Sequence, residues 1–310
     1  MNLRFRRLVL AVFLAYGMYA SGHFQIAAAD PADAFECGGA LSQGGLLICR
    51  SEPGDVISAN DYRVEVPSSG IITLGLSRNA PDKLSVKLIR TGEEVATYDF
   101  SITPRNDPTR IVSGLDCDKV DARSDAQKAH AGRSWQKKVA AFAVFEFADA
   151  FPKRFERPSE GRISSPFGPV RTYRGVSAET GEPCSRESVH RGYDIAAPIG
   201  TPIRAPAPGT VLLAEDDLYY EGGTVFLDHG FGLVSVFIHM SSVEVSAGDR
   251  VDTSTLLGAV GNTGRTTGPH LHWAVKWRNI VSSDRSADFY IDPGLLLDLD
   301  LTEFSPSPTY

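Results

Sequence analysis

The stretch His270-Leu271-His272-Trp273-Ala274-Val275-Lys276-Trp277 combines a strand-like pattern with two histidines. Side chains i and i+2 of a strand project to the same face, so His270 and His272 are expected to point together. Similar short apolar runs, separated by glycine and proline, precede it between residues 161 and 293. Together they predict an antiparallel β-sheet domain over residues 158–293. The runs are 162–165, 210–214, 224–227, 233–238, 256–260 and 271–277.

The remainder of the chain is predicted to be mainly β, with one helix. Residues 34–115 alternate in hydrophobicity between turn signals and predict a small β-sandwich-like domain. Residues 116–157 are predicted as a linking helix and linker, with the helix spanning 121–151 and ending before Pro152. Residues 294–310 are predicted as a flexible tail. The helix carries an apolar stripe that is expected to pack on a neighbouring domain: Trp135, Val139, Phe142, Ala143, Phe147 and Ala150.

The first 29 residues resemble an export signal. A basic start is followed by an apolar run over residues 8–20 and by the small residues Ala27-Ala28-Ala29. An uncleaved anchor is the alternative, but the run is short for a bilayer span of about 20 residues. We therefore predict a cleaved signal peptide over residues 1–29. The mature protein is expected to be periplasmic, or alternatively secreted or associated with the cell wall, without stable membrane insertion.

Charge and cysteine content narrow the function further. The 310 residues include 31 basic and 38 acidic groups, a net charge of −7, which argues against a nucleic-acid partner. Four cysteines allow three pairings, and an exported protein can form disulfides. We favour Cys37 with Cys49 and Cys117 with Cys184. Four buried thiols are one alternative, and a Cys184 thiolate that caps a metal is another.

Five histidines of the last domain provide the main functional signal: His190, His229, His239, His270 and His272. His190 and Asp194 lie four residues apart, with Gly192 between them to let the chain bend. A catalytic zinc site takes three protein ligands and leaves a fourth position for water. His190, Asp194 and one of the His270/His272 pair make such a set. The remaining imidazole would then be free for proton chemistry.

Two further histidines of this domain are assigned by their neighbours. His239 follows the predicted strand 233–238, on the face shared with Ser235 and Phe237, and is a second candidate free imidazole. His229 lies between Asp228 and Gly230 and is expected to be a turn residue.

At this point the sequence resembles the lysostaphin-type zinc metallopeptidases, which cleave peptide cross-links of bacterial peptidoglycan. The resemblance covers about residues 159–292, and the segments upstream also resemble the exported branch of this family. The motifs that carry it are GRISSPFG at 161–168, HRGYDIAAP at 190–198, GTPIRAP at 200–206, DHGFG at 228–232 leading to His239, and GNTGRTTGPHLH at 261–272. Departures from the family pattern are the long segment 169–189, Phe237 and Met240.

The resemblance implies a role for each of the clustered residues. His190, Asp194 and His272 become the ligands of one Zn²⁺ per chain, and His239 and His270 become the catalytic pair that orients water and moves protons. It thereby implies an endopeptidase that hydrolyses peptidoglycan stem peptides with water activated by the metal. Non-catalytic members that bind cell wall or activate a partner hydrolase are the alternative function. A purely structural metal site would need a fourth protein ligand, and none is evident.

Overall fold

The N-terminal β-module is a two-sheet sandwich. The computed structural model describes residues 35–145, 151–282 and 284–300, so the predicted signal peptide 1–29 lies outside the described residues. A three-stranded sheet has the order β1-β2-β5, and a four-stranded sheet has the order β4-β3-β6-β7. The strands are β1 (Glu36–Gly39), β2 (Leu46–Arg50), β3 (Val56–Ala59), β4 (Tyr62–Glu65), β5 (Ile71–Gly75), β6 (Lys83–Arg90) and β7 (Glu93–Ser101).

Strand alternation builds the core of this module. In β4, Tyr62 and Val64 are buried while Arg63 and Glu65 are exposed, and β6 repeats the pattern over its first six residues. A half-buried strand requires this period of two. The predicted Cys37–Cys49 disulfide is confirmed and joins directly opposed residues of β1 and β2.

The C-terminal domain is built on a large, mainly antiparallel sheet, as predicted. Its strand order is β17-β14-β15-β16-β19-β12-β9, with β13, β18 and β20 attached beside it. The strands are β9 (Arg162–Ser165), β12 (Tyr193–Ala196), β13 (Pro202–Arg204), β14 (Gly209–Leu218), β15 (Gly222–Asp228), β16 (Leu233–Val243), β17 (Arg250–Val251), β18 (Leu256–Val260), β19 (His270–Trp277) and β20 (Phe289–Ile291).

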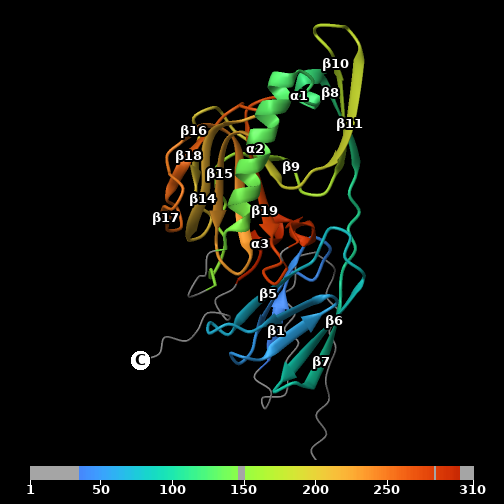
Figure 1. Cartoon of the computed structure of the whole chain (residues 1–310), viewed down its shortest axis with the longest axis vertical. Helices are drawn as coiled ribbons and strands as arrows, with labels where there is room; N and C mark the ends of the chain where they lie inside the picture. Colours follow the sequence, from blue (N-terminus) through green and yellow to red (C-terminus); the bar gives the residue numbers. More distant parts are fainter. Residues whose placement is uncertain (1–34, 146–150, 283, 301–310) are drawn as a thin grey trace, which may run out of the picture.

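Helix α2 (Asp125–Ala143) covers one face of this sheet (Figure 1). A capping box between Ser124 and Gln127 starts the helix. Near its C-terminal end, Phe142 stacks on Phe226 of β15 with the ring centroids 4.6 Å apart. The predicted packing stripe is only partly correct. Trp135 and Val139 are 64% and 43% exposed, because the residues of the helix that are buried against the sheet domain are Ser134, Ala141 and Phe142.

A buried ion pair fixes the C-terminal end of α2. The guanidinium of Arg278 is fully buried and lies 2.5 Å from Asp228 Oδ2. The same guanidinium donates to the carbonyls of Phe142 and Val144, which have no partner inside the helix. A charge buried this deeply is tolerated only because it is paired and hydrogen-bonded.

The module and the sheet domain share one hydrophobic core. Trp277 of β19 packs edge-on against Tyr62 of the module, with the ring centroids 5.3 Å apart, and its indole N–H donates to Thr73. Thr73 in turn donates to the carbonyl of Phe231. Arg105, which follows the last module strand, pairs with Asp292 near the end of the sheet domain at 2.8 Å. These contacts hold the two parts in a fixed relation.

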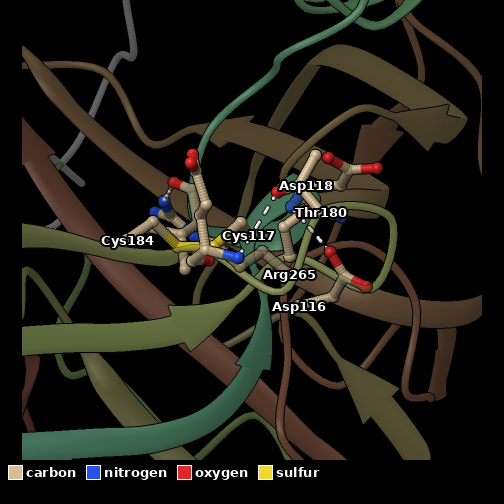
Figure 2. Close-up of a disulfide and its surroundings, with 9 residues drawn as sticks. Asp116, Cys117, Asp118, Thr180, Cys184 and Arg265 are labelled. Atoms are coloured by element: carbon tan, nitrogen blue, oxygen red, sulfur yellow. Dashed lines mark hydrogen bonds between the residues drawn. A yellow bond between two sulfur atoms is a disulfide. The ribbon is translucent and has the colours of Figure 1, made fainter.

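Strand β8 (Thr109–Asp116) leaves the module and joins the sheet domain. It pairs in parallel with β10 (Val170–Val176), which forms a hairpin with β11 (Pro183–Val189). Residues 109–115 were predicted to belong to the first domain, but their strand hydrogen bonds go to β10 of the second. The short helix α1 (Cys117–Val120) follows, and the predicted Cys117–Cys184 disulfide is confirmed between α1 and β11 (Figure 2).

The predicted tail begins with ordered structure. Helix α3 (Pro293–Leu297) starts at the cap residue Asp292, and Leu296 and Leu299 are buried in the shared core. A short 3₁₀ turn, η1 (Arg285–Ala287), precedes β20. None of the helices in the described ranges has the length and apolarity needed to cross a membrane.

The two disulfides close loops of very different length, so their removal should cost different amounts of stability. The sequence separations are 67 residues for Cys117–Cys184 and 12 for Cys37–Cys49. The chain-entropy relation predicts losses of about 4 kcal/mol for Cys117→Ser/Cys184→Ser and about 3 kcal/mol for Cys37→Ser/Cys49→Ser. Urea unfolding of both double variants and the wild type measures these losses. A larger loss for the short loop would contradict the entropic account.

Candidate metal and catalytic site

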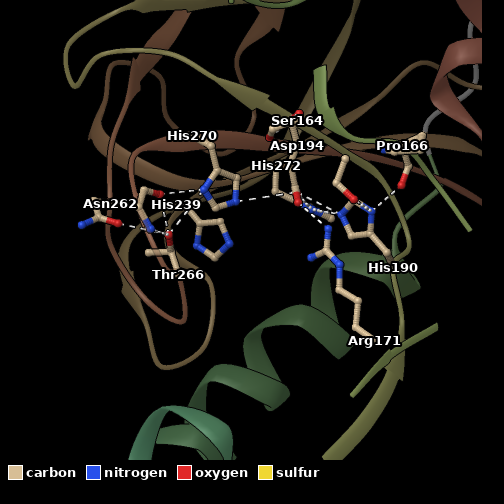
Figure 3. Close-up of polar contacts among 12 residues, drawn as sticks. Ser164, Pro166, Arg171, His190, Asp194, His239, Asn262, Thr266, His270 and His272 are labelled. Atoms are coloured by element: carbon tan, nitrogen blue, oxygen red, sulfur yellow. Dashed lines mark hydrogen bonds and ion pairs between the residues drawn. The ribbon is translucent and has the colours of Figure 1, made fainter. Parts of the chain in front are cut away.

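Three side chains of the sheet domain bring ligand atoms to one point. His190 Nε2 lies 2.9 Å from Asp194 Oδ1 and 3.1 Å from His272 Nδ1, and His272 Nδ1 lies 2.8 Å from the same carboxylate oxygen (Figure 3). Within the described ranges this is the group of histidine, cysteine and acidic residues with the geometry to hold a metal ion. His190 and Asp194 are buried, and His272 is 13% exposed.

Strand pairing and one glycine create this convergence. Asp194 of β12 lies directly opposite His272 of β19 in the antiparallel register. Gly192 lets the chain pass close to β19, since an added Cβ would collide with the backbone oxygen of Trp273 and lie 2.8 Å from His272 Nε2. The bend predicted between His190 and Asp194 therefore depends on the absence of a side chain at this position.

Outer contacts orient the ligand atoms. His190 Nδ1 donates to the carbonyl of Pro166 at 2.6 Å, which leaves Nε2 as the lone-pair atom facing Asp194. Arg171 of β10 donates to Asp194 Oδ2 at 2.6 Å, so the two carboxylate oxygens have separate partners. Burial tends to raise the pKa of Asp194, but the contacts with the His190 and His272 imidazoles outweigh it and hold that pKa well below its usual range.

His239 and His270 lie beside this triad. The His239 ring centroid is 4.8 Å from that of His270 and 6.3 Å from that of His272, and His270 Nε2 is 3.6 Å from Asp194 Oδ1. Both rings donate Nδ1–H to backbone carbonyls, of Thr263 and Gly268, at 2.8 Å. Burial, together with the neighbouring imidazoles of His270 and His272, lowers the pKa of His239 to about 3, so this ring is neutral at neutral pH.

The backbone at His239 departs from the predicted strand alternation. Its φ is +68°, a left-handed conformation that is uncommon for residues other than glycine. The local irregularity lets consecutive residues, Ile238 and His239, both line the site, which a regular strand would not do. The prediction that His239 faces the site by sharing a face with Ser235 and Phe237 was therefore wrong in its reason. Those two residues are fully buried in the core.

The site residues line a groove of about 450 Å³. One wall comes from β8 and β10, including Val112, Leu115 and Tyr173, and the other from the loop before β19, including Thr266. Thr266 Oγ1 donates to the carbonyl of Gly268, the same oxygen that receives His270 Nδ1–H. The long segment 169–189, identified as a departure from the family pattern, thus forms part of the groove as the β10–β11 hairpin.

Other candidates from the sequence lie outside the triad. His229 Nδ1 bonds the Pro208 carbonyl and Nε2 bonds Ser235, so it is a buried structural residue of a turn. Cys184 is in a disulfide, which removes the thiolate alternative. Sequence reasoning missed Arg171 and Thr266, although the position of Arg171 shortly after the 161–168 motif could have drawn attention to it.

Comparison with known proteins agrees with this geometry. Residues 188–284 match the family model described as Peptidase family M23, and this span includes all five clustered residues. The chain carries a peptidase domain of family M23. The M23 domain and its upstream segments superpose on a crystal structure of a peptidase M23 from Pseudomonas aeruginosa with a TM-score of 0.58 at 26% identity. That match covers 83% of this chain and 95% of the other.

Curated relatives match through the M23 domain. Peptidoglycan DD-endopeptidase ShyA of Vibrio cholerae is 35% identical over 128 residues, which is 40% of this chain and 28% of that protein. DD-carboxypeptidase/endopeptidase Mpg of Neisseria meningitidis is 37% identical over 120 residues, which is 37% of this chain and 24% of that protein. The chain therefore spans about a quarter of the length of these relatives.

The buried His229 predicts acid-dependent stability. Burial lowers its pKa from 6.5 to about 4, against the opposing effect of the Pro208 carbonyl. A group with a depressed pKa in the folded state stabilises the fold above pH 6.5, and this contribution is lost as the pH falls toward 4. Between pH 7 and pH 4, the unfolding free energy of the metal-free wild type should therefore fall by about 3 kcal/mol more than that of metal-free His229→Gln.

Urea titrations at both pH values measure this difference. His130→Gln on α2 is the matched control and should keep the wild-type pH dependence, since the His130 side chain is 31% exposed at the surface, where it contacts Asp217 and Tyr219. Equal pH dependence in wild type and His229→Gln would exclude this residue as the source.

Proposed function

We propose that this chain is a zinc-dependent endopeptidase that hydrolyses peptide cross-links of bacterial peptidoglycan. The observation that carries the proposal is the convergence of His190, Asp194 and His272 within 3.1 Å in the lining of a groove, with two further imidazoles beside them. A peptidase needs a group that activates water and groups that move protons. This arrangement supplies residues for both.

The donor set fits a zinc ion. His190 and His272 offer ring nitrogens and Asp194 offers one carboxylate oxygen, and these are ligands that Zn²⁺ prefers. The three donor atoms are mutually close enough for one ion to bind them all. Three protein ligands leave a position open, as catalytic sites require. When bound, zinc acidifies a water molecule and polarises the scissile carbonyl.

His239 and His270 are assigned the proton transfers. Because each ring donates Nδ1–H to a backbone carbonyl, Nε2 is the ring nitrogen left to take part in proton transfer. This nitrogen accepts a proton from water as the water oxygen forms a bond to the carbonyl carbon. The proton then passes to the amine nitrogen as the peptide C–N bond breaks. The carbonyls of Thr263 and Gly268 hold the rings in this orientation.

The proposed substrate and the proposed compartment are supported by different observations. Relatives named as peptidoglycan DD-endopeptidase and DD-carboxypeptidase/endopeptidase share the domain that contains the site. The two disulfides fit an oxidising compartment, and the export signal expected over residues 1–29 fits the same location. We therefore place the substrate, the stem peptides of peptidoglycan, and the protein together in the periplasm.

The two groups of histidines should respond differently to substitution. His272→Ala removes a ligand and is expected to abolish both zinc binding and activity. His239→Ala is expected to retain one zinc per chain and to lose about 10²- to 10⁴-fold in turnover, the usual contribution of a proton-transfer group. Zinc content measured after dialysis, together with turnover, separates these effects. Equal zinc loss in the two variants would contradict this division of roles.

Cross-linked muropeptides provide the direct test of the function. The mature chain is incubated with them after zinc loading or after chelation, and the products are analysed by mass spectrometry. Fragments that depend on zinc and disappear in His270→Ala are the expected result, and their masses identify the bond. His130→Ala, on helix α2 and outside the groove, serves as the active control. Absence of fragments from the zinc-loaded wild type would favour a binding or activator role.

A further inference from the structure

The groove around the site has an excess of positive charge. Its two lining carboxylates already have partners: Asp194 pairs with Arg171 at 2.6 Å, and Glu221 pairs with Lys138 of α2. Three further arginines line the groove and form no ion pair with any carboxylate in the described part of the chain. They are Arg110, Arg191 and Arg265. This local charge contrasts with the net charge of −7 for the whole chain.

The guanidinium of Arg265 is held in place, and one of its edges is free to bind a ligand. Its guanidinium lies between the rings of Tyr173 and Tyr220, at 5.1 and 5.0 Å from their centroids, next to the Cys117–Cys184 disulfide (Figure 2). Nη1 donates to the carbonyl of Val120 at 3.3 Å. Nε and Nη2 have no partner among the described residues and are not buried. These two N–H groups form the edge that binds a carboxylate through two parallel hydrogen bonds.

Arg110 is placed by strand register. It is the parallel partner of Arg171, which bonds the ligand Asp194, so both side chains lie on the groove side of the β8–β10 pair. Two guanidinium groups side by side repel each other. Arg171 has Asp194 as its partner, and Arg110 has none in the described ranges. An anion bound in the groove would relieve this repulsion.

We propose that the groove recognises a free carboxylate on the peptide, held by Arg265 and Arg110 on the residue that supplies the leaving amine. The proposal rests on the proposed function and defines its substrate class as an acidic peptide. An acidic protein repels an anionic substrate at long range, so binding requires a local basic surface. The preorganised edge of Arg265 provides it in the loop that leads to His270, the first residue of β19.

A set of three cross-linked stem-peptide dimers tests the recognition. The first keeps every carboxylate, the second has a carboxamide on the residue that supplies the leaving amine, and the third has a carboxamide at the C-terminus only. Wild-type kcat/KM for the second should be about 10- to 100-fold lower than for the first, the effect expected for a charge-assisted hydrogen bond. The third should be cleaved like the first. Loss with the third alone would overturn the assignment of the carboxylate.

Variants of the enzyme, measured on the same dimers, test whether Arg265 and Arg110 bind this carboxylate. Arg265→Gln and Arg110→Gln should each lower kcat/KM for the first dimer about 10-fold or more while leaving the second unchanged. Arg110 is an exposed strand residue, so its variant is expected to fold even if Arg265→Gln disturbs the loop. Arg174→Gln is the matched control, because Arg174 follows Tyr173 on β10 but does not line the groove. Equal losses on both dimers would overturn the proposal.

Binding distinguishes failure of this inference from failure of the proposed function. The dimers are titrated calorimetrically into zinc-loaded His270→Ala protein. Cleavage of the first two dimers at equal rates would leave the endopeptidase intact and overturn carboxylate recognition. If no dimer is cleaved but the first binds more tightly than the second and Arg265→Gln removes the difference, the carboxylate site stands without the endopeptidase. Neither cleavage nor discrimination in binding would overturn both.

Discussion

The antiparallel register between β12 and β19 is the constraint on which the site depends. It places Asp194 directly opposite His272, and the side-chain period of two brings His270 to the same face. A shift of one residue in this pairing would turn both imidazoles away from Asp194. The register is fixed by burial, since Leu271, Trp273 and Val275 alternate with the histidine positions and are fully buried in the core on the other face.

Several parts of this arrangement were predictable because their causes are local. The pairing of His270 with His272 follows from strand geometry, and the close approach at Gly192 follows from the absence of a side chain. The large sheet and the module could be predicted from short alternating runs with turn residues between them. Both disulfides were correctly preferred, although spacing alone left three pairings open.

Other features depend on contacts between distant segments, which single-sequence patterns do not encode. Strand β8 resembles a module strand in its sequence, yet its hydrogen-bond partner is β10, about 60 residues later. The predicted helix stripe failed at Trp135 because helical periodicity does not reveal which residues of a helix face its neighbour, and here Ser134 rather than Trp135 is buried against the sheet domain. The position of His239 did not follow from strand alternation because its left-handed backbone, at φ +68°, breaks the alternation within β16.

Through Arg171, the upstream part of the chain helps to position the candidate metal ligand Asp194. Asp194 is charged and buried, and such a group requires compensating charge and hydrogen bonds. Arg171 supplies both from β10, so the carboxylate is held only if this strand is in place. β10 pairs with β8 on one side and β11 on the other, and the Cys117–Cys184 disulfide ties the end of β8 to β11. The groove wall is therefore also a support for the ligand carboxylate. This dependence explains why a segment that begins in the module is fastened covalently to the sheet domain.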